Sequence, residues 1–552
     1  MKLHRAAAVL LLLVALMAWL GFRHLIAPWP LAPAKLNIFI ITIDSLRPGH
    51  LSAYGYGRPT SPNLERLARE GVRFDRVINQ ASWTNAALIS MWTSRYPSVH
   101  GVEGRSDSFP AGALSPLHLL RNAGYATPGI SYLTQTPNYA NLGFQPTRER
   151  DPLAWLDAHP QRPFFLWLHL TGPHLPYDPK PASLARFDPD GRIVGGANPA
   201  VLKTLRQEVI IKRGTLRLGE AERRAIAALY DAEVLEEDAE IGRYLEGLRA
   251  RGLEDSTLVI VGADHGEELG DHGHVGHAST SLAGTLYQEV IQVPLIMRLP
   301  GVLPRGARVP HLVEGVDLMP TLFDLLRLPP LPWRAGRSLL PLLFDRRPAW
   351  EHLAFAETTP CGFQCPEGDQ PRLRMLQSPR WKYIQTARGQ VIEREELYDL
   401  EADAQETRDL AARQPQVRAQ FAARLQVIRA ANEEQRHGLL PPPGAVPPAE
   451  DGGGVVVLAP KPGEVLTFAA TGGRIVVRLG GEPGSRYRIQ YDIGEETYRV
   501  RGELHLEGGE HIYGPFSPAL WLRFLLYNPW RFRVAREGSS HWSAWISFRL
   551  AS

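Results

Sequence analysis

Uninterrupted apolar runs, set apart by helix-like stretches, constrain the fold of this 552-residue chain more than any other feature. A run that is apolar at every position suits a strand buried on both faces, whereas a strand with one wet face alternates apolar and polar residues. Buried strands that alternate with helices predict an α/β fold with a mainly parallel sheet flanked by helices. Four such runs stand at residues 36–43, 162–170, 256–263 and 293–301.

Helical stretches lie between these runs. Residues 61–74 predict a helix in which Ser61 suits the N-cap, Pro62 the first helical position and Gly71 the exit. The stretch from 219 to 252 is also helical in pattern. Both helices lie between predicted strands in the chain, as the crossover connections of a parallel sheet require.

The composition of the chain changes toward its C-terminal end. Residues 441–454 form a Pro/Gly-rich linker by composition, and short β-rich segments with turns between them follow. A chain of 552 residues is also too long for one ordinary core. We therefore expect an anchor and connector at 1–35, a large α/β domain at 36–440, the linker, and a small antiparallel β-sandwich at 455–552.

An uninterrupted apolar run of 17 residues, 6–22, follows the basic residues Lys2 and Arg5. Its length is near the lower limit of about 17–25 residues for crossing a bilayer. We favour an uncleaved single-pass anchor, although residues 31–35 also resemble the cleavage site of a signal peptide. Basic residues before the run predict that the rest of the chain lies outside the cell (inner) membrane, facing the periplasm or the exterior.

Net charge and cysteine content narrow the class of protein. The formal net charge is +3 and no run of Lys and Arg is interleaved with aromatic residues, so nucleic-acid binding is not expected. The sequence has two cysteines, Cys361 and Cys365, which either form a local disulfide in an oxidising compartment or remain free thiols. Two such ligands alone make a poor zinc site.

Acidic residues follow two of the apolar runs. Asp44 comes directly after the first run, and Asp264 and His265 come after the third. Ligands in open α/β sheets bind beyond the carboxyl ends of the strands. Carboxylates supply the negative charge that a divalent cation requires, and an imidazole ligand favours zinc or manganese over calcium. These residues therefore predict a divalent metal site. Asp44 taken by itself more often caps a turn or a helix.

Thr84 lies between these acidic residues in the sequence, at the predicted start of a helix. A threonine hydroxyl at this place is a natural N-cap. A helix N-terminus is also an anion-binding site, and coordination to a metal activates a hydroxyl as a nucleophile. The pattern therefore leaves two roles open for Thr84, a helix cap or a nucleophile.

Several motifs together resemble the sulfatase family of the alkaline phosphatase superfamily. The resemblance implies that residues 36–440 form a sulfatase-like catalytic domain, with one divalent metal ion (zinc, manganese or calcium) at the carboxyl edge of its sheet. The motifs stand in that family's order between residues 37 and 411: ITIDSLRPGHLSAYGY, ASWTNAALISMWTSRYPSVHGV, GPHLPY, ADHGEELGDHG, VPLIMRLPG, VDLMPTLFDLL and ELYDLEADAQETRDLA.

The same resemblance assigns metal ligation to Asp44, Thr84, Asp264 and His265. Thr84 stands where sulfatases place the Cys or Ser that becomes formylglycine, so a formylglycine cofactor is not expected. An unmodified threonine nucleophile resembles instead the lipoteichoic acid synthases and phosphoethanolamine transferases of the superfamily. The aspartate that often follows the first metal ligand is Ser45 here.

Four further residues match functional positions of the family, and we count all four as catalytic candidates. His174 and His277 correspond to residues beside the sulfate group of the substrate. Arg95 and His100 correspond to the segment that supports the nucleophile loop. His169 lies within an apolar run, and we expect it to be a core histidine.

Three functions are compatible with this sequence. The first is a membrane-anchored, metal-dependent hydrolase of sulfate or phosphate esters. The second is a phospho-group transferase of the phosphoethanolamine or glycerophosphate type, acting on a lipid or glycan. The third is a non-catalytic, sulfatase-like binding protein. The expected partners are sulfated or phosphorylated small molecules, glycans or lipids, and the membrane through the N-terminal helix.

Overall fold

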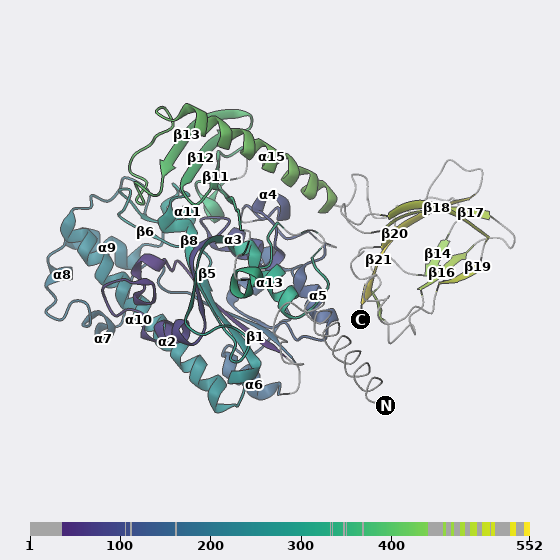
Figure 1. Cartoon of the computed structure of the whole chain (residues 1–552), viewed down its shortest axis with the longest axis horizontal. Coiled ribbons are helices and arrows are strands. Elements are labelled where there is room, and N and C mark those ends of the chain that lie inside the picture. Colours follow the sequence, from purple (N-terminus) through teal and green to yellow (C-terminus); the bar gives the residue numbers. More distant parts are fainter. Residues whose placement is uncertain are drawn as a thin grey trace, which may run out of the picture.

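The computed structural model describes most of the α/β part of the chain and a set of C-terminal strands (Figure 1). The predicted anchor at residues 6–22 and the predicted linker at 441–454 lie outside the described residues. Among the residues that are described, no helix is both long enough and apolar enough to span a bilayer. The described residues are 36–439, without 105, 111–112, 161–162, 332, 334, 346–347, 349 and 367–368, together with the strands between 456 and 551.

A seven-stranded sheet forms the centre of the α/β part, in the order β3-β4-β1-β5-β8-β2-β9. Its neighbouring strands are parallel, except that β8 runs antiparallel to both β5 and β2. This topology confirms the prediction of a mainly parallel sheet, and the apolar run at 293–301 is its antiparallel member. The strands are β1 (Asn37–Ile43), β2 (Val72–Ile78), β3 (Gly129–Ile130), β4 (Phe165–Leu170), β5 (Thr257–Ala263), β8 (Gln292–Arg298) and β9 (Ala307–Glu314), and β6 (Glu268–Leu269) pairs with β7 (Val275–Gly276) beside it.

Helices cover both faces of this sheet, with α2 and α10 on one side and α3 and α13 on the other (Figure 1). Strands β1 and β5 are buried at every position, because neither of their faces meets water. The α-helices are α2 (Pro62–Glu70), α3 (Thr84–Thr93), α4 (Pro97–His100), α5 (Pro116–Asn122), α6 (Pro152–Ala158), α7 (Pro181–Leu184), α8 (Arg192–Gly195), α9 (Pro199–Gln207), α10 (Glu220–Ala250), α11 (Ala278–Ser281), α12 (Gln288–Ile291), α13 (Leu318–Leu325), α14 (Leu340–Phe344) and α15 (Pro415–Leu439).

A second, antiparallel sheet of four strands completes the α/β part, in the order β10-β11-β12-β13. Helix α15 packs on it, with Phe421 and Leu425 of the helix in one apolar cluster with Phe355 and Tyr383 of the strands. The sequence pattern did not single out these strands, because several are rich in charged residues; VIEREELYD forms β13. Their bounds are β10 (Ala354–Thr358), β11 (Arg372–Gln377), β12 (Trp381–Arg388) and β13 (Val391–Asp399).

The loop that follows β10 contains both cysteines. Cys361 and Cys365 form a disulfide, with their Cα atoms 4.8 Å apart. The local disulfide is therefore the correct one of the two alternatives that the sequence left open. The same loop contacts α11, where the backbone N–H of Phe363 donates to Ser279 Oγ at 3.1 Å.

The C-terminal strands form two further sheets. One has the order β14-β16-β19 and the other β15-β21-β20-β17-β18. The expected antiparallel pairing holds except between β15 and β21, which run parallel. The strands are β14 (Val456–Ala459), β15 (Val465–Thr467), β16 (Ile475–Gly480), β17 (Arg486–Ile493), β18 (Val500–Glu507), β19 (Gly509–Tyr513), β20 (Trp530–Arg536) and β21 (Ile546–Ala551).

The N-terminus of α2 shows how the long helix α10 is attached to the rest of the fold. Ser61 is the N-cap residue and Pro62 follows it, as predicted, but the Ser61 side chain makes no cap hydrogen bond. Asp238 of α10 takes over the capping: its carboxylate accepts from the backbone N–H of Asn63 at 2.9 Å and of Leu64 at 2.8 Å. Burial raises the pKa of Asp238 to about 6, although these N–H groups favour its charged form.

We predict that Asp238→Ala destabilises the fold. The variant leaves two backbone N–H groups at a buried helix end without acceptors, which costs about 1–3 kcal/mol in the free energy of unfolding. Chemical denaturation followed by circular dichroism measures the loss. Glu246→Ala, at an exposed position of the same helix, is the control and should change the value by less than about 0.5 kcal/mol. Equal effects of the two substitutions would contradict the capping role.

Candidate active site

The register of the central sheet brings two acidic residues together. Ile43 at the end of β1 pairs with Ala263 at the end of β5, so the next residues, Asp44 and Asp264, lie side by side at the carboxyl edge. Asn79 holds this edge in place, because its side-chain amide donates to the carbonyl oxygens of residues 263 and 264 at 2.8 and 2.6 Å. The site therefore lies at the sheet edge that the sequence predicted.

The two carboxylates are buried, so their negative charges are costly unless positive charge lies nearby. Burial, followed by the charge of Asp44, raises the pKa of Asp264. Burial alone would also raise the pKa of Asp44, but the neighbouring imidazoles of His174, His169 and His265, when protonated, hold that pKa far below its usual range. Two carboxylates in a buried site require compensating positive charge, which a divalent cation supplies.

His265 is oriented as a metal ligand. Its Nδ1 lies 2.9 Å from the carbonyl oxygen of Gly266, which only accepts, so Nδ1 carries a proton and, in the neutral imidazole, Nε2 has the lone pair. That Nε2 lies 3.6 Å from Asp44 Oδ1, 3.4 Å from Asp264 Oδ2 and 3.3 Å from Thr84 Oγ1. A lone pair that faces two carboxylates is repelled by them, whereas a cation between them attracts all three. The donor atoms therefore fit a divalent metal ion.

Gly266 permits the chain to turn away directly after His265. Its backbone N–H donates to the carbonyl oxygen of Val290 at 2.6 Å. A Cβ atom at this position would stand 2.0 Å from the carbonyl oxygen of Glu289, so any other residue here would push the two segments apart. The close approach explains the glycine in the Asp-His-Gly string.

Thr84 reaches the site from the opposite side, as the first residue of α3. The N-cap residue is Trp83, and the N-terminus of α3 has no side-chain cap hydrogen bond. The Thr84 hydroxyl instead faces His265 Nε2, so the alternative role of this side chain as an N-cap is wrong. Thr84 is also only partly buried, whereas Asp44 and Asp264 are fully buried. It is the member of this group through which a substrate can approach.

His174 and His277 stand next to this group. The ring centroid of His277 is 4.2 Å from that of His265 and 5.0 Å from that of His174. His174 Nδ1 bonds to the carbonyl oxygen of Leu175. His277 Nδ1 lies 2.8 Å from Oε1 of Glu267, a fully buried carboxylate. Glu267 was not predicted as a site residue, although it belongs to the Asp-His-Gly-Glu string.

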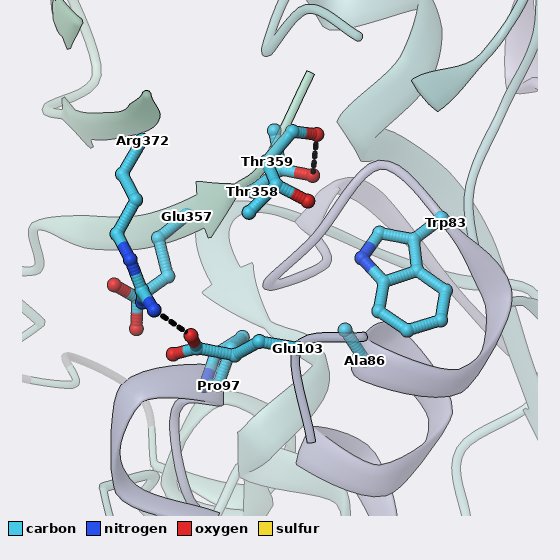
Figure 2. A pocket seen from close by; sticks show the side chains of 8 residues that line it. All are labelled: Trp83, Ala86, Pro97, Glu103, Glu357, Thr358, Thr359 and Arg372. Carbon is cyan, nitrogen blue, oxygen red and sulfur yellow. Dashed lines mark hydrogen bonds and ion pairs between the residues drawn. The ribbon is translucent and has the colours of Figure 1, made fainter. Parts of the chain in front are cut away.

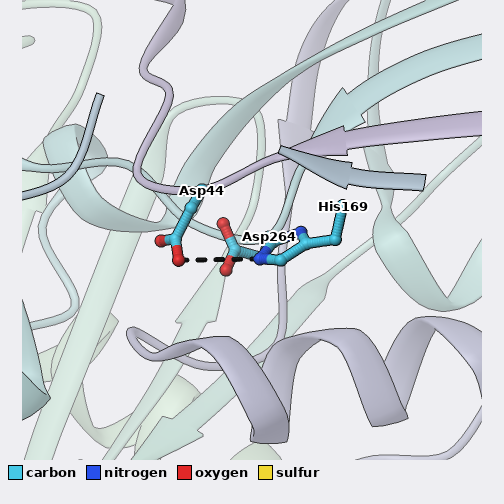
Figure 3. A group of neighbouring side chains, drawn as sticks. All are labelled: Asp44, His169 and Asp264. Atoms are coloured by element: carbon cyan, nitrogen blue, oxygen red, sulfur yellow. Dashed lines mark ion pairs between the residues drawn. The ribbon is translucent and has the colours of Figure 1, made fainter. Parts of the chain in front are cut away.

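His169 is the clearest residue that the sequence misassigned. It lies on β4 opposite Thr42, and its side chain points to the acidic pair rather than into the apolar core (Figure 3). Its Nε2 is 3.6 Å from Asp44 Oδ2. Asp44, His169 and Asp264 each offer a ligand atom, and these atoms lie within 4.8 Å of one another. No periodicity could have shown this, because the proximity depends on the order of the strands.

Arg95 and His100 do not belong to the site. The Arg95 guanidinium donates to the carbonyl oxygen of Leu114 at 3.0 Å and lies over the ring of Trp333 at 4.4 Å. His100 Nε2 is 3.0 Å from the hydroxyl of Ser90 on α3. Both side chains are fully buried behind α3. The structure therefore corrects their prediction as catalytic residues: they support the helix whose first residue is Thr84.

A separate small cavity lies behind the first turn of α3 (Figure 2). Arg372 of β11 and Glu103 form an ion pair across it, and Glu357 lies beside them. Thr84 does not line this cavity, so it is not the substrate site. It is lined by Trp83, Ala86, Pro97, Glu103, Glu357, Thr358, Thr359 and Arg372.

Comparisons with known proteins find sulfatases and a phosphonate monoester hydrolase among the proteins similar to this chain. Arylsulfatase K of Gallus gallus is 29% identical over 285 residues, which are 46% of this chain and 49% of that protein. The chain thus spans about half the length of this curated relative. The N-acetylglucosamine-6-O-sulfatase of Bacteroides thetaiotaomicron is 24% identical over 472 residues, 68% of this chain and 82% of that protein. The solved phosphonate monoester hydrolase of Agrobacterium radiobacter has the same fold, with a TM-score of 0.56 at 22% identity over 72% of this chain and 96% of that one.

Family models cover the parts of the chain that build the site. The model described as N-sulphoglucosamine sulphohydrolase, C-terminal, matches residues 283–431, which include the four-stranded sheet and most of α15. The sulfatase model matches residues 36–154 and 151–328, which include the central sheet and all the residues grouped around Asp44 and Asp264. Because that match extends over more than half of the chain, this protein belongs to the sulfatase family.

Proposed function

We propose that this chain is a metal-dependent hydrolase of sulfate or phosphate esters in which unmodified Thr84 is the nucleophile. The observation that carries the proposal is the direction of the Thr84 hydroxyl. It faces His265 Nε2 at 3.3 Å, at the start of a helix that it does not cap. A bound divalent ion would lower the pKa of this hydroxyl and neutralise charge on the ester. Asp44, Asp264 and His265 would hold that ion.

The proposed reaction begins when Thr84 Oγ1 forms a bond to the phosphorus or sulfur atom of the ester. The bond from that atom to the alcohol oxygen breaks, and the alcohol leaves. The hydroxyl proton passes through His277 Nε2 to the departing oxygen. Glu267 supports this transfer, because its side chain bonds to His277 Nδ1 and fixes the direction in which the ring presents Nε2. His174 bonds to the oxygens of the ester, and the N-terminus of α3 adds its backbone N–H groups.

The second half of the reaction releases the phosphoryl or sulfuryl group from Thr84. Water attacks the phosphorus or sulfur atom, His277 Nε2 accepts a proton from that water, and the same proton passes to the Thr84 oxygen as its bond to phosphorus or sulfur breaks. An alcohol of a lipid or glycan in place of water would make the enzyme a transferase, so product analysis with and without added acceptor separates these two functions. The activities for which the relatives are named, an arylsulfatase and an N-acetylglucosamine-6-O-sulfatase, support a sulfated glycan as the first substrate to test.

We further propose that residues 6–22 anchor the enzyme in the cell membrane, with the catalytic domain in the periplasm or at the exterior. The apolar run with basic residues before it supports this topology. Protease added to spheroplasts should degrade the catalytic domain. Protection of the domain until the cells are lysed would contradict the topology, and a control cytoplasmic protein must stay intact throughout.

We predict that Thr84→Ala abolishes turnover of every sulfate and phosphate ester while the protein stays folded. The hydroxyl is the bond-forming group, whereas a side chain that makes no cap bond contributes little to stability. Mass spectrometry of the wild-type protein after rapid quenching should find the phosphoryl or sulfuryl adduct on the peptide that carries Thr84. Ser82→Ala is the matched control, because its hydroxyl bonds to Thr358 and should leave turnover nearly unchanged. Activity that survives in Thr84→Ala but not in Ser82→Ala would overturn the assignment.

We also predict that the effect of His277→Ala depends on the leaving group. Loss of a proton-transfer residue lowers kcat by about 10²–10⁴-fold for an ester with a poor alcohol leaving group. An ester whose leaving group is stable as an anion, such as nitrophenolate, should lose less, because it needs no proton on leaving and only the acceptance of the Thr84 proton is impaired. A kinetic series of esters ordered by the pKa of the leaving alcohol measures this difference. An equal loss across the whole series would show that His277 does not protonate the leaving group.

A further inference from the structure

The Nε2 atom of His169 faces the two acidic residues, Asp44 and Asp264. Its side chain is fully buried, and its Nε2 has no hydrogen-bond partner among the described residues. Asp264 Oδ2 is likewise buried without a hydrogen-bond partner. Buried polar atoms are normally satisfied, so two of them that face one site mark the place of a missing partner. His169 Nε2 and Asp44 Oδ2 are 3.6 Å apart, too far for a hydrogen bond, which leaves both atoms available to a ligand between them.

The other ring nitrogen of His169 is held from behind by Thr42. The indole N–H of Trp167 donates to Thr42 Oγ1 at 2.8 Å, and His169 Nδ1 lies 2.9 Å from the same oxygen. The Thr42 hydroxyl also points to the carbonyl oxygen of Leu168 at 3.5 Å. When the hydroxyl donates to that carbonyl, Thr42 accepts from both ring N–H groups. Nδ1 of His169 then carries the proton, and Nε2 is left with a lone pair that faces the acidic pair.

Ser45 leaves the site short of one carboxylate. Relatives often have an aspartate directly after the residue that corresponds to Asp44, whereas Ser45 here donates its hydroxyl to Asp44 Oδ1 at 3.1 Å. The Ser45 backbone N–H also donates to Asp264 Oδ1 at 3.2 Å. Ser45 thus orients both carboxylates but adds no charged ligand of its own.

We infer that His169 is a ligand of the metal, and that Thr42 with Trp167 holds it in the ligating tautomer. The inference rests on the metal site of the proposed function. It changes the donor set, because two imidazoles then join two carboxylates and one hydroxyl. Calcium prefers six to eight oxygen ligands, whereas imidazole favours transition metals. The site should therefore select Zn²⁺ or Mn²⁺ over Ca²⁺.

Metal titration of the metal-stripped full-length protein tests this inference without any ester. Calorimetry with Zn²⁺, Mn²⁺ and Ca²⁺ should show wild-type binding of Zn²⁺ and Mn²⁺ at least about 100-fold tighter than Ca²⁺. His169→Gln should weaken Zn²⁺ binding by about 10–100-fold and change Ca²⁺ binding little. Thr42→Val should weaken Zn²⁺ binding by about 10-fold, and Thr42→Ser should restore it, because the serine hydroxyl accepts the same bond.

The controls separate ligation from folding. His159→Gln changes an exposed histidine outside the site and should bind all three ions as the wild type does. His169→Asn serves as a second variant if His169→Gln loses its unfolding transition. The double variant Ser45→Asp/His169→Gln should shift the metal preference toward Ca²⁺, because it removes an imidazole ligand and adds a carboxylate.

Three results would overturn the inference. His169→Gln that binds Zn²⁺ like the wild type, while Asp264→Asn does not, would remove His169 from the ligands. Thr42→Val with unchanged affinity would remove the supporting role of Thr42. Tighter binding of Ca²⁺ than of Zn²⁺ and Mn²⁺ by the wild type would refute the proposed selectivity for transition metals. Failure of the proposed function looks different, because the protein would then bind Zn²⁺ tightly and turn over no ester.

Discussion

The structure depends on two buried carboxylates at the ends of neighbouring parallel strands. Asp44 and Asp264 are adjacent because β1 and β5 pair in register up to their last residues. Both carboxylates are buried, so their charges require compensation, which the neighbouring histidines and the proposed divalent cation would supply. The fold and the chemistry therefore depend on the same feature. The apolar layers that stabilise the sheet also bury the two carboxylates at its edge, which makes their negative charges costly without positive partners.

The histidines around this edge follow a common rule. Each has its Nδ1 bonded to an oxygen atom, from a carbonyl group, a carboxylate or a hydroxyl, and so has Nε2 available at the site. Fixing one ring nitrogen selects the tautomer and the direction of the ring at the same time. The four residues come from β4 or from the loops that follow β4, β5 and β7, and they are His169, His174, His265 and His277.

The features that could be predicted from sequence are those that depend on residues close together in the chain. Apolar runs predicted the strands, and the residues directly after them, Asp44 and Asp264, predicted the metal edge. His169 and Asp238 were missed because their roles arise between segments 125 or more residues apart. The strands β10 to β13 were missed because their charged residues hide the alternation of buried and exposed positions. The resemblance places Arg95 and His100 in the segment that supports the nucleophile loop, and only the structure shows that their side chains are buried behind α3 rather than beside Thr84.

The contacts of the four-stranded sheet with the Thr84 segment have a consequence for the modular history of such proteins. Thr358 at the end of β10 bonds to Ser82, and Glu357 bonds through its backbone N–H to the carbonyl oxygen of Gln80. The loop bearing the disulfide contacts Ser279, two residues after His277. Recombination that exchanged residues 283–431 between relatives would therefore also exchange the surface on which the nucleophile segment rests. The nucleophile segment and the sheet that it contacts are thus coupled in space, even though they are encoded far apart in the gene.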